Sequence, residues 1–142
     1  MHRAFLLAAL LATGACGSSE AMRAPPPKQS SLTVATTALR DNLLSAHATF
    51  DGALITDVRP TGRCDAVILT AAGSSPVKWK NLGDLIGHTK GDQMIFDIPA
   101  GVKTHILSFP SGETAAGFSD TATRIRMGLG LLDRECGGVL IR

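Results

Sequence analysis

The chain is 142 residues long, 44% hydrophobic, 18% charged and 4% aromatic, with a formal net charge of +2. This length accommodates one domain of ordinary size, and the apolar fraction excludes wholesale disorder. The small positive charge argues against a nucleic-acid-binding protein, because such proteins normally carry a concentrated basic surface.

Residues 1–15 have the three regions of a bacterial export signal. His2 and Arg3 form a short positive region, and an apolar run of about nine residues extends from Ala4 to Ala12. A helix needs about 20 residues to span a bilayer, so this run is too short for a transmembrane segment. Its length is typical of the hydrophobic region of a signal peptide, and we expect residues 1–15 to be removed.

The stretch Thr13-Gly14-Ala15-Cys16 resembles the lipobox of bacterial lipoproteins, with Thr13 where that family usually has Leu. The resemblance implies cleavage before Cys16, a thioether link from Cys16 to diacylglycerol, and an acyl chain such as palmitate on the new amine. Two or more acyl chains hold a protein stably on a membrane. Gly17 replaces the Asp that favours inner-membrane retention, which implies the periplasmic face of the outer membrane. The alternatives are an ordinary signal peptide and an uncleaved anchor.

Residues 16–30 predict a lipidated cysteine followed by a spacer. The segment lacks apolar periodicity and contains Pro25-Pro26-Pro27, which favours an extended polyproline conformation. One small domain is then expected over residues 31–142, with a modest core.

The domain is predicted to begin with a helix over residues 31–50, because Leu32, Ala35, Leu39 and Leu43 recur at steps of three and four. Strand-like runs follow at residues 53–59, 63–72, 77–82, 93–98 and 102–109. The segments 73–76 and 88–92 are interpreted as a turn and a loop. Strands joined by such short connections pair antiparallel.

The clearest periodic signal is the final helix, which we expect after an N-cap at Ser119 and before Gly137. Its apolar stripe consists of Phe118, Ala122, Ile125, Leu129, Leu132 and Cys136. Residues 139–141 are interpreted as a short edge strand. The predicted class is α+β, a mainly antiparallel curved sheet of about five strands with an N-terminal helix and a C-terminal amphipathic helix packed on it.

Two cysteines remain when Cys16 is set aside. Cys64 lies on the predicted apolar face of a strand, and Cys136 lies on the apolar stripe of the last helix. In an exported protein this pair predicts one disulfide. The alternatives are two free thiols or a redox or metal role, and the chain lacks the CxxC motif that would favour the latter.

Catalytic and metal-binding motifs are absent from the sequence. His88 and His105 are the candidate residues of a small hydrolase, and Ser111, His105 and Asp97 could form a triad, although nothing in their spacing requires it. No metal ligand set and no cofactor site are predicted.

Two features indicate a contact surface. Lys78 and Lys80 alternate with Trp79 on a predicted strand, so they could face an anionic headgroup, whereas a solvated outer sheet face is the plainer interpretation. Trp79 is the only tryptophan and is interpreted as a core residue, or alternatively as an exposed anchor for a ligand or partner.

The sequence therefore predicts a membrane-anchored extracytoplasmic lipoprotein with no catalytic activity, acting as a binding or structural module of the cell envelope. Its expected partners are the membrane, through Cys16, and an unidentified envelope protein or ligand, with no nucleic acid. The alternatives are a small envelope hydrolase using His105 or His88, and an inhibitor or immunity-type protein.

Overall fold

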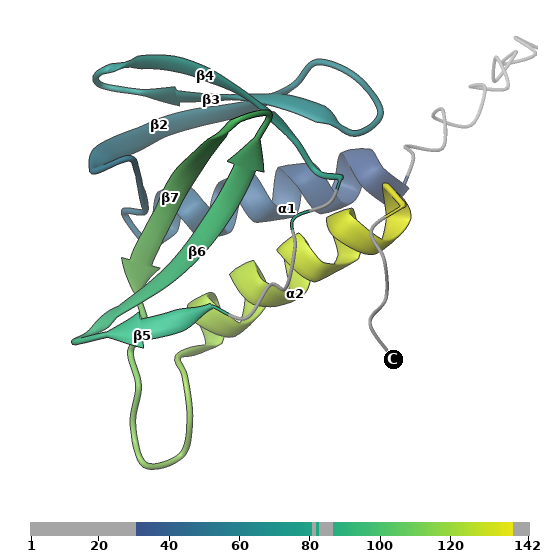
Figure 1. The fold of residues 1–142 in the computed structure, drawn as a ribbon. Helices are drawn as coiled ribbons and strands as arrows, with labels where there is room; N and C mark the ends of the chain where they lie inside the picture. The colour runs from purple at the N-terminus through teal and green to yellow at the C-terminus, as the bar shows by residue number, and fades with distance from the viewer. Residues whose placement is uncertain (1–30, 81, 83–86, 138–142) are drawn as a thin grey trace, which may run out of the picture.

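The computed structural model describes residues 31–80, 82 and 87–137. The expected signal peptide, the tether and the expected strand over residues 139–141 lie outside these described residues. Along the chain, one helix comes before the seven strands and the other comes after them (Figure 1). The elements are α1 (Ser31–Ser45), β1 (Thr49–Phe50), β2 (Ala53–Pro60), β3 (Asp65–Thr70), β4 (Gly73–Lys78), β5 (His88–Lys90), β6 (Gln93–Ala100), β7 (Lys103–Pro110) and α2 (Asp120–Glu135).

The strands form one antiparallel sheet in the order β4-β3-β2-β1-β7-β6-β5. The register between β2 and β3 shifts between Ile55 and Asp57, so Thr56 is an extra residue on β2. Ile55 and Val58 are consequently both buried although they are three positions apart. Such a bulge increases the local twist of a strand. The sheet is strongly curved, and β4 lies against β6 although the two are not paired (Figure 1).

The α+β class and the antiparallel sheet are confirmed, with seven strands instead of about five. The predicted helix over residues 31–50 is too long, because α1 ends at Ser45 and Phe50 belongs to β1. His47 adopts a positive φ of 51°, a conformation that stops helical propagation. Phe50 is still a core residue, as its apolar character indicates, but it reaches the core from a strand.

Two segments interpreted as connections are strands. Residues 73–76 form most of β4, and the hairpin from β3 turns at Ala71 and Ala72 instead. Pro76 lacks an N–H, and β4 tolerates it because this strand is at the edge of the sheet. Residues 88–90 form β5, a three-residue strand at the opposite edge.

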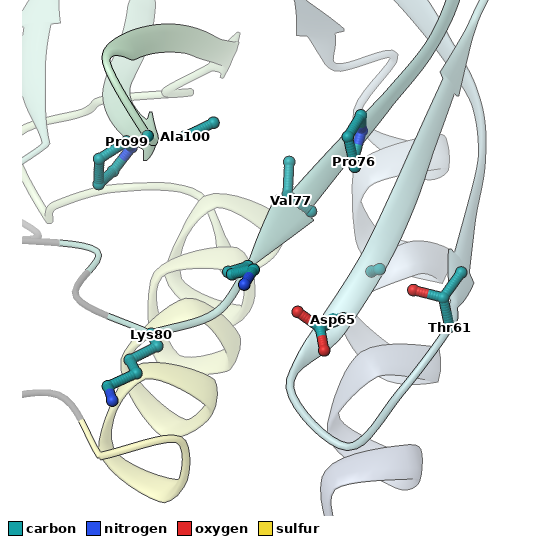
Figure 2. Close-up of a pocket in the computed structure, with 10 residues that line it drawn as sticks. Thr61, Asp65, Pro76, Val77, Lys80, Pro99 and Ala100 are labelled. Carbon is teal, nitrogen blue, oxygen red and sulfur yellow. The ribbon is translucent and has the colours of Figure 1, made fainter.

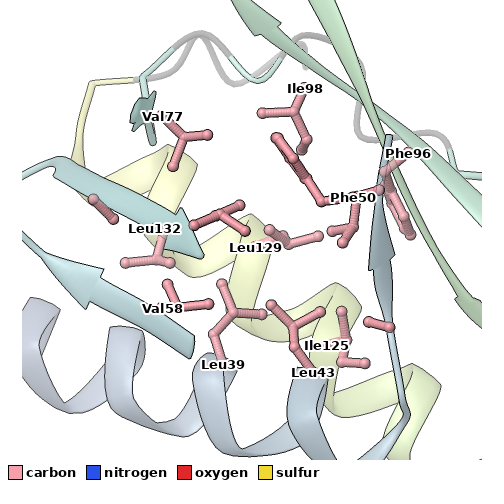
Figure 3. Packing of buried hydrophobic residues seen from close by; sticks show 14 of the residues in the cluster. Leu39, Leu43, Phe50, Val58, Val77, Phe96, Ile98, Ile125, Leu129 and Leu132 are labelled. Atoms are coloured by element: carbon pink, nitrogen blue, oxygen red, sulfur yellow. The ribbon is translucent and has the colours of Figure 1, made fainter. Parts of the chain in front are cut away.

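The core lies between the concave face of the sheet and the two helices. Figure 3 shows Leu39 and Leu43 of α1 meeting Ile125, Leu129 and Leu132 of α2 beneath the strands. The α2 stripe is confirmed, since Ala122, Ile125, Leu129 and Leu132 are fully buried. Ser119 caps α2 as expected, because its hydroxyl accepts a 3.2 Å hydrogen bond from the backbone N–H of Ala122.

The helices lie side by side in opposite directions, so the start of α1 and the end of α2 meet at one end of the domain (Figure 1). Ser31, at the start of α1, and Glu135, at the end of α2, therefore lie at the same end of the domain. Among the described residues, neither helix combines the length and the apolar character needed to cross a membrane.

Candidate functional site

A pocket of about 540 Å³ lies where the sheet stops short of closing on itself. The edge strand β4 forms one side, and the turn between β6 and β7 forms the other (Figure 2). We call this site the seam pocket. Its lining consists of Thr61, Asp65, Ala66, Pro76, Val77, Lys78, Lys80, Pro99, Ala100 and Gly101. Its volume lies within the range of about 300–1,000 Å³ that is typical of small-molecule sites.

The seam pocket has an apolar part and a polar part. Ala66 and Val77, which are core residues, form its apolar floor. In Figure 2 the labelled residues Val77 and Pro99 lie toward one end of the pocket, and Asp65 and Lys80 lie toward the other. This separation of apolar and charged groups along one pocket suits a ligand that is itself apolar at one end and charged at the other.

Both predicted contact lysines line the seam pocket. Lys78 and Lys80 are exposed while Trp79 between them is buried, as expected. The strand predicted over residues 77–82 is nevertheless wrong in its bounds, because β4 ends at Lys78 and residues 79–80 form a bend. Asp65 is paired with Lys78 in the strand register, yet their charged groups form no ion pair. Within the described part of the chain, neither lysine ammonium has a carboxylate within 4.0 Å.

Trp79 lies in the core and not on the surface. Its relative exposure is 2%, which agrees with the core interpretation and leaves no exposed indole for a partner. The Nε1 atom of Trp79 is buried and has no hydrogen-bond acceptor among the described residues. The indole of Trp79 therefore packs in the core, while the lysines on either side of it line the seam pocket.

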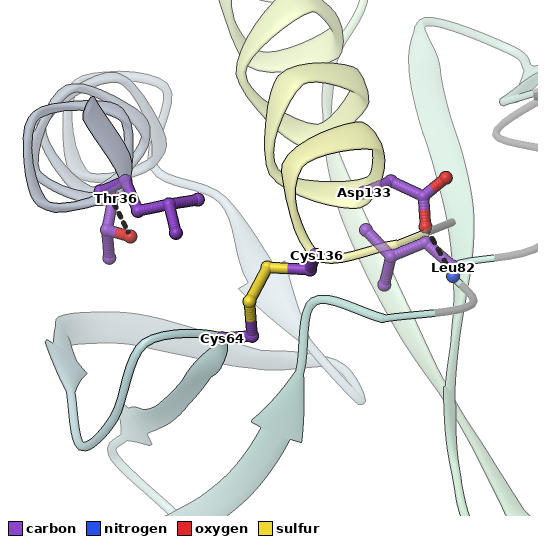
Figure 4. Close-up of a disulfide and its surroundings, with 6 residues drawn as sticks. Thr36, Cys64, Leu82, Asp133 and Cys136 are labelled. Carbon is purple, nitrogen blue, oxygen red and sulfur yellow. Dashed lines mark hydrogen bonds between the residues drawn. A yellow bond between two sulfur atoms is a disulfide. The ribbon is translucent and has the colours of Figure 1, made fainter. Parts of the chain in front are cut away.

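The predicted disulfide is present. Cys64 and Cys136 are joined with their Cα atoms 5.7 Å apart, which ties the turn before β3 to the end of α2 (Figure 4). The backbone N–H of Trp79 donates to the carbonyl of Cys64 at 2.9 Å. The backbone N–H of Leu82 donates to the Asp133 carboxylate at 3.0 Å, so the chain on both sides of Lys80 is attached to disulfide-linked elements (Figure 4).

His105 pairs with an acidic residue that the sequence analysis did not select. The Asp51 carboxylate lies 2.6 Å from Nδ1 of His105 and accepts the backbone N–H of Ile106 at 2.8 Å. Burial raises the pKa of Asp51, but these two hydrogen bonds outweigh it and leave this pKa below its ordinary value. The imidazole also stacks on Phe50 with 4.9 Å between ring centroids. The pair closes the turn between β1 and β2.

The triad that the sequence allowed does not assemble. Asp97 is paired with Ile106, whereas His105 is paired with Ile98, so Asp97 and His105 occupy opposite faces of the sheet. Ser111 lies six positions along the chain from His105, roughly 20 Å in an extended strand. The Ser111 hydroxyl is buried and donates to the carbonyl of Asp92 at 3.0 Å, which is a structural role in a turn.

His88 lies on the short edge strand β5, opposite Ile95. It is exposed and takes part in no side-chain hydrogen bond with the described residues. Over residues 31–80, 82 and 87–137, no three His, Cys, Asp or Glu side chains are grouped so that they could hold a metal ion.

A second hollow of about 660 Å³ runs along the outer side of the helix pair. It is shallow and apolar, and small residues such as Ala38 and Gly128 form its floor. Arg124 and Arg134 lie along its rim. In this hollow the charged residues are not grouped at one end, as they are in the seam pocket.

No protein-family model matches the chain, and searches of curated proteins and of solved structures gave no significant match.

Proposed function

We propose that this protein is a lipid-anchored, non-catalytic binding module of the bacterial cell envelope, held at the periplasmic face of the outer membrane through Cys16. The lipobox-like stretch before Cys16 supports the anchor. The Cys64–Cys136 disulfide supports an oxidising compartment such as the periplasm.

The seam pocket is the observation that carries the binding role. It reaches core residues, it has charged groups at its rim, and its lining residue Asp65 adjoins the Cys64–Cys136 disulfide. A pocket formed by paired strands and a disulfide binds at a lower ordering cost than a mobile surface would incur.

The alternative role as a small hydrolase has one supporting observation, the hydrogen bond between Asp51 and His105. That pair resembles the base and orienting acid of a triad, but no hydroxyl or thiol of the described residues is hydrogen-bonded to the His105 ring. The pair also closes a turn, which accounts for its presence.

The anchor is tested by labelling cells with a clickable palmitate analogue. We expect label on the wild-type protein and on a Cys64→Ser/Cys136→Ser control, and none on Cys16→Ser, which should also leave the membrane fraction. Retention of unlabelled Cys16→Ser protein in that fraction would contradict the anchor.

The binding role is tested by thermal unfolding of the purified lipoprotein in detergent with and without a total lipid extract of the envelope. A ligand that binds only the folded state raises Tm. We expect a rise for the wild type and a smaller one for Ala100→Phe, which fills the seam pocket. An equal rise for both proteins would place the binding elsewhere.

A further inference from the structure

We infer that the seam pocket binds a single-chain anionic amphiphile, such as a fatty acid or a lysophospholipid, with its anionic group at Lys80 and Lys78 and its chain against the apolar floor. This inference rests on the proposed binding role and adds the chemical class of the ligand.

The charge of the pocket favours an anion. Two lysines and one aspartate line it, and neither lysine is neutralised by a carboxylate of the described residues. Lys78 is the last residue of β4 and Lys80 lies in the bend that follows it, and both are exposed whereas Trp79 between them is buried. A carboxylate or phosphate held by both would gain charge-assisted hydrogen bonds.

The apolar part of the pocket favours a chain over a free anion. Ala66 and Val77 are 1% and 2% exposed, so the floor of the pocket is the surface of the hydrophobic core itself. Pro76, Pro99 and Ala100 form apolar walls above it (Figure 2). A small hydrophilic anion would leave these surfaces in contact with water, whereas an alkyl chain would remove them from it, at about 0.8 kcal/mol per buried CH₂.

The place of the pocket in the fold suits a ligand that comes from the membrane. Thr61 and Asp65 of its polar part flank Cys64, and Cys64 is bonded to Cys136 at the end of α2. That end of α2 lies beside the start of α1, where the lipidated tether joins the domain (Figure 1). The charged part of the pocket therefore lies at the anchored end of the domain.

The single tryptophan provides the assay. Trp79 lies between the two lysines, so a nitroxide-labelled amphiphile in the pocket should quench its fluorescence. The purified full-length lipoprotein in dodecyl maltoside micelles is titrated with doxyl-labelled stearate and, separately, with the methyl ester of the same molecule, which has the same chain but no charge. We expect saturable quenching by the stearate, with half-saturation about tenfold lower than for the ester.

Three variants locate the effect. Lys80→Gln and Lys78→Gln should each weaken the binding of doxyl-stearate several-fold, and Ala100→Phe should weaken both probes. Lys90→Gln, which removes a lysine from the far edge strand β5, is the matched control and should leave both titrations unchanged. The Tm of each variant in the absence of probe shows whether the fold is intact.

Equal half-saturation by the acid and the ester would overturn the anionic class and leave the seam pocket as an apolar binding site. Quenching that rises linearly with both probes would overturn binding of any amphiphile there, while the palmitate label on Cys16 would still decide the anchor separately. Displacement of doxyl-stearate by millimolar inorganic phosphate would show that a free anion, and not an amphiphile, is the ligand.

Discussion

Cys64 and Cys136 lie 72 positions apart in the sequence and are joined by a disulfide that ties the turn before β3 to the last residues of α2. The bond lies at the end of the domain where α1 begins and α2 ends, beside the polar part of the seam pocket (Figure 1). It therefore links the end of α2 covalently to the turn that borders the seam pocket.

Removal of this bond should destabilise the protein strongly. A closed loop of this length reduces the entropy of the unfolded chain by an amount equivalent to about 4 kcal/mol. We expect Cys64→Ala/Cys136→Ala to lose most of this free energy of unfolding and to melt more than about 10 °C below the wild type. Thermal unfolding with and without a reductant measures this loss of stability. A reductant should lower the Tm of the wild type and leave that of the double variant unchanged, and an insensitive wild type would contradict the prediction.

Asp57 of β2 couples the sheet to α1 through Arg40 and also pairs with Arg59 of its own strand. Its carboxylate accepts hydrogen bonds from Nε of Arg40 at 2.5 Å and from Nε of Arg59 at 2.8 Å. These two bonds lower the pKa of Asp57 to about 2, and the bond from Arg40 has the larger effect. Because this pKa is lower in the folded state, the ionised carboxylate stabilises the protein at pH values above its unfolded-state pKa of about 3.9. This stabilisation is lost as the pH falls toward 2.

We expect Asp57→Asn to lower the free energy of unfolding by about 1 kcal/mol at pH 7. The difference from the wild type should shrink as the pH falls from about 4 to about 2, because the wild-type carboxylate becomes protonated there. Urea unfolding at a series of pH values measures both effects. Asp41→Asn, which removes an exposed carboxylate that also contacts Arg40, is the control and should change stability by less than about 0.5 kcal/mol. A pH-independent difference for Asp57→Asn would be the contrary result.

Two glycines should respond oppositely to the same substitution. Gly130 lies within α2, and a Cβ there meets nothing within 4 Å, so Gly130→Ala should stabilise the protein by about 1 kcal/mol through helix propensity. Gly112 has a φ of +54°, and a Cβ there would lie 2.7 Å from Cβ of Ser119, the N-cap of α2. Gly112→Ala should therefore destabilise by about 2 kcal/mol. Chemical denaturation of the two variants decides this, and a shift of the same sign in both would contradict it.

The fluorescence of Trp79 should report a buried indole. At 2% exposure, its emission should be blue-shifted and weakly quenched by iodide in the folded protein, and both properties should change only on unfolding. The measurement is a Stern–Volmer titration before and after addition of guanidinium chloride. Strong iodide quenching in the folded state would show that Trp79 is exposed to solvent. It would contradict the placement of Trp79 in the core beside the seam pocket.

Much of the fold follows from local patterns. The stripe of α2, its cap at Ser119 and the alternation around Trp79 depend on contacts within a few residues, and the structure confirms each of them. The pairing of Cys64 with Cys136 could be predicted because only these two cysteines remain when Cys16 is set aside, and both adjoin apolar segments that pack in one core, although Cys64 lies in the turn before β3 and not on the strand as expected.

The features that were misjudged depend on partners distant in the sequence. Residues 73–76 and 88–90 are polar or contain proline, so their composition favours a turn and a loop, yet pairing with a neighbouring strand makes both of them extended. Phe50 continues the helical periodicity of the preceding residues, but pairing with Leu107 and Ala53 holds it in a strand. Tertiary hydrogen bonds outweighed local preference in these places.

By itself the sequence determined the α+β class, the apolar faces of the elements and the identity of the disulfide partners, because each of these follows from composition, spacing or periodicity. The lipidation of Cys16 stays a prediction that rests on the lipobox resemblance. Only the tertiary structure decided that Asp51 pairs with His105, that Asp97 and Ser111 stay apart from it, and that three separate segments meet around the seam pocket. The physical reason is the curvature of the sheet, since the bulge at Thr56 and the helices packed inside bring β4 against β6, and no local pattern encodes how far an open sheet bends.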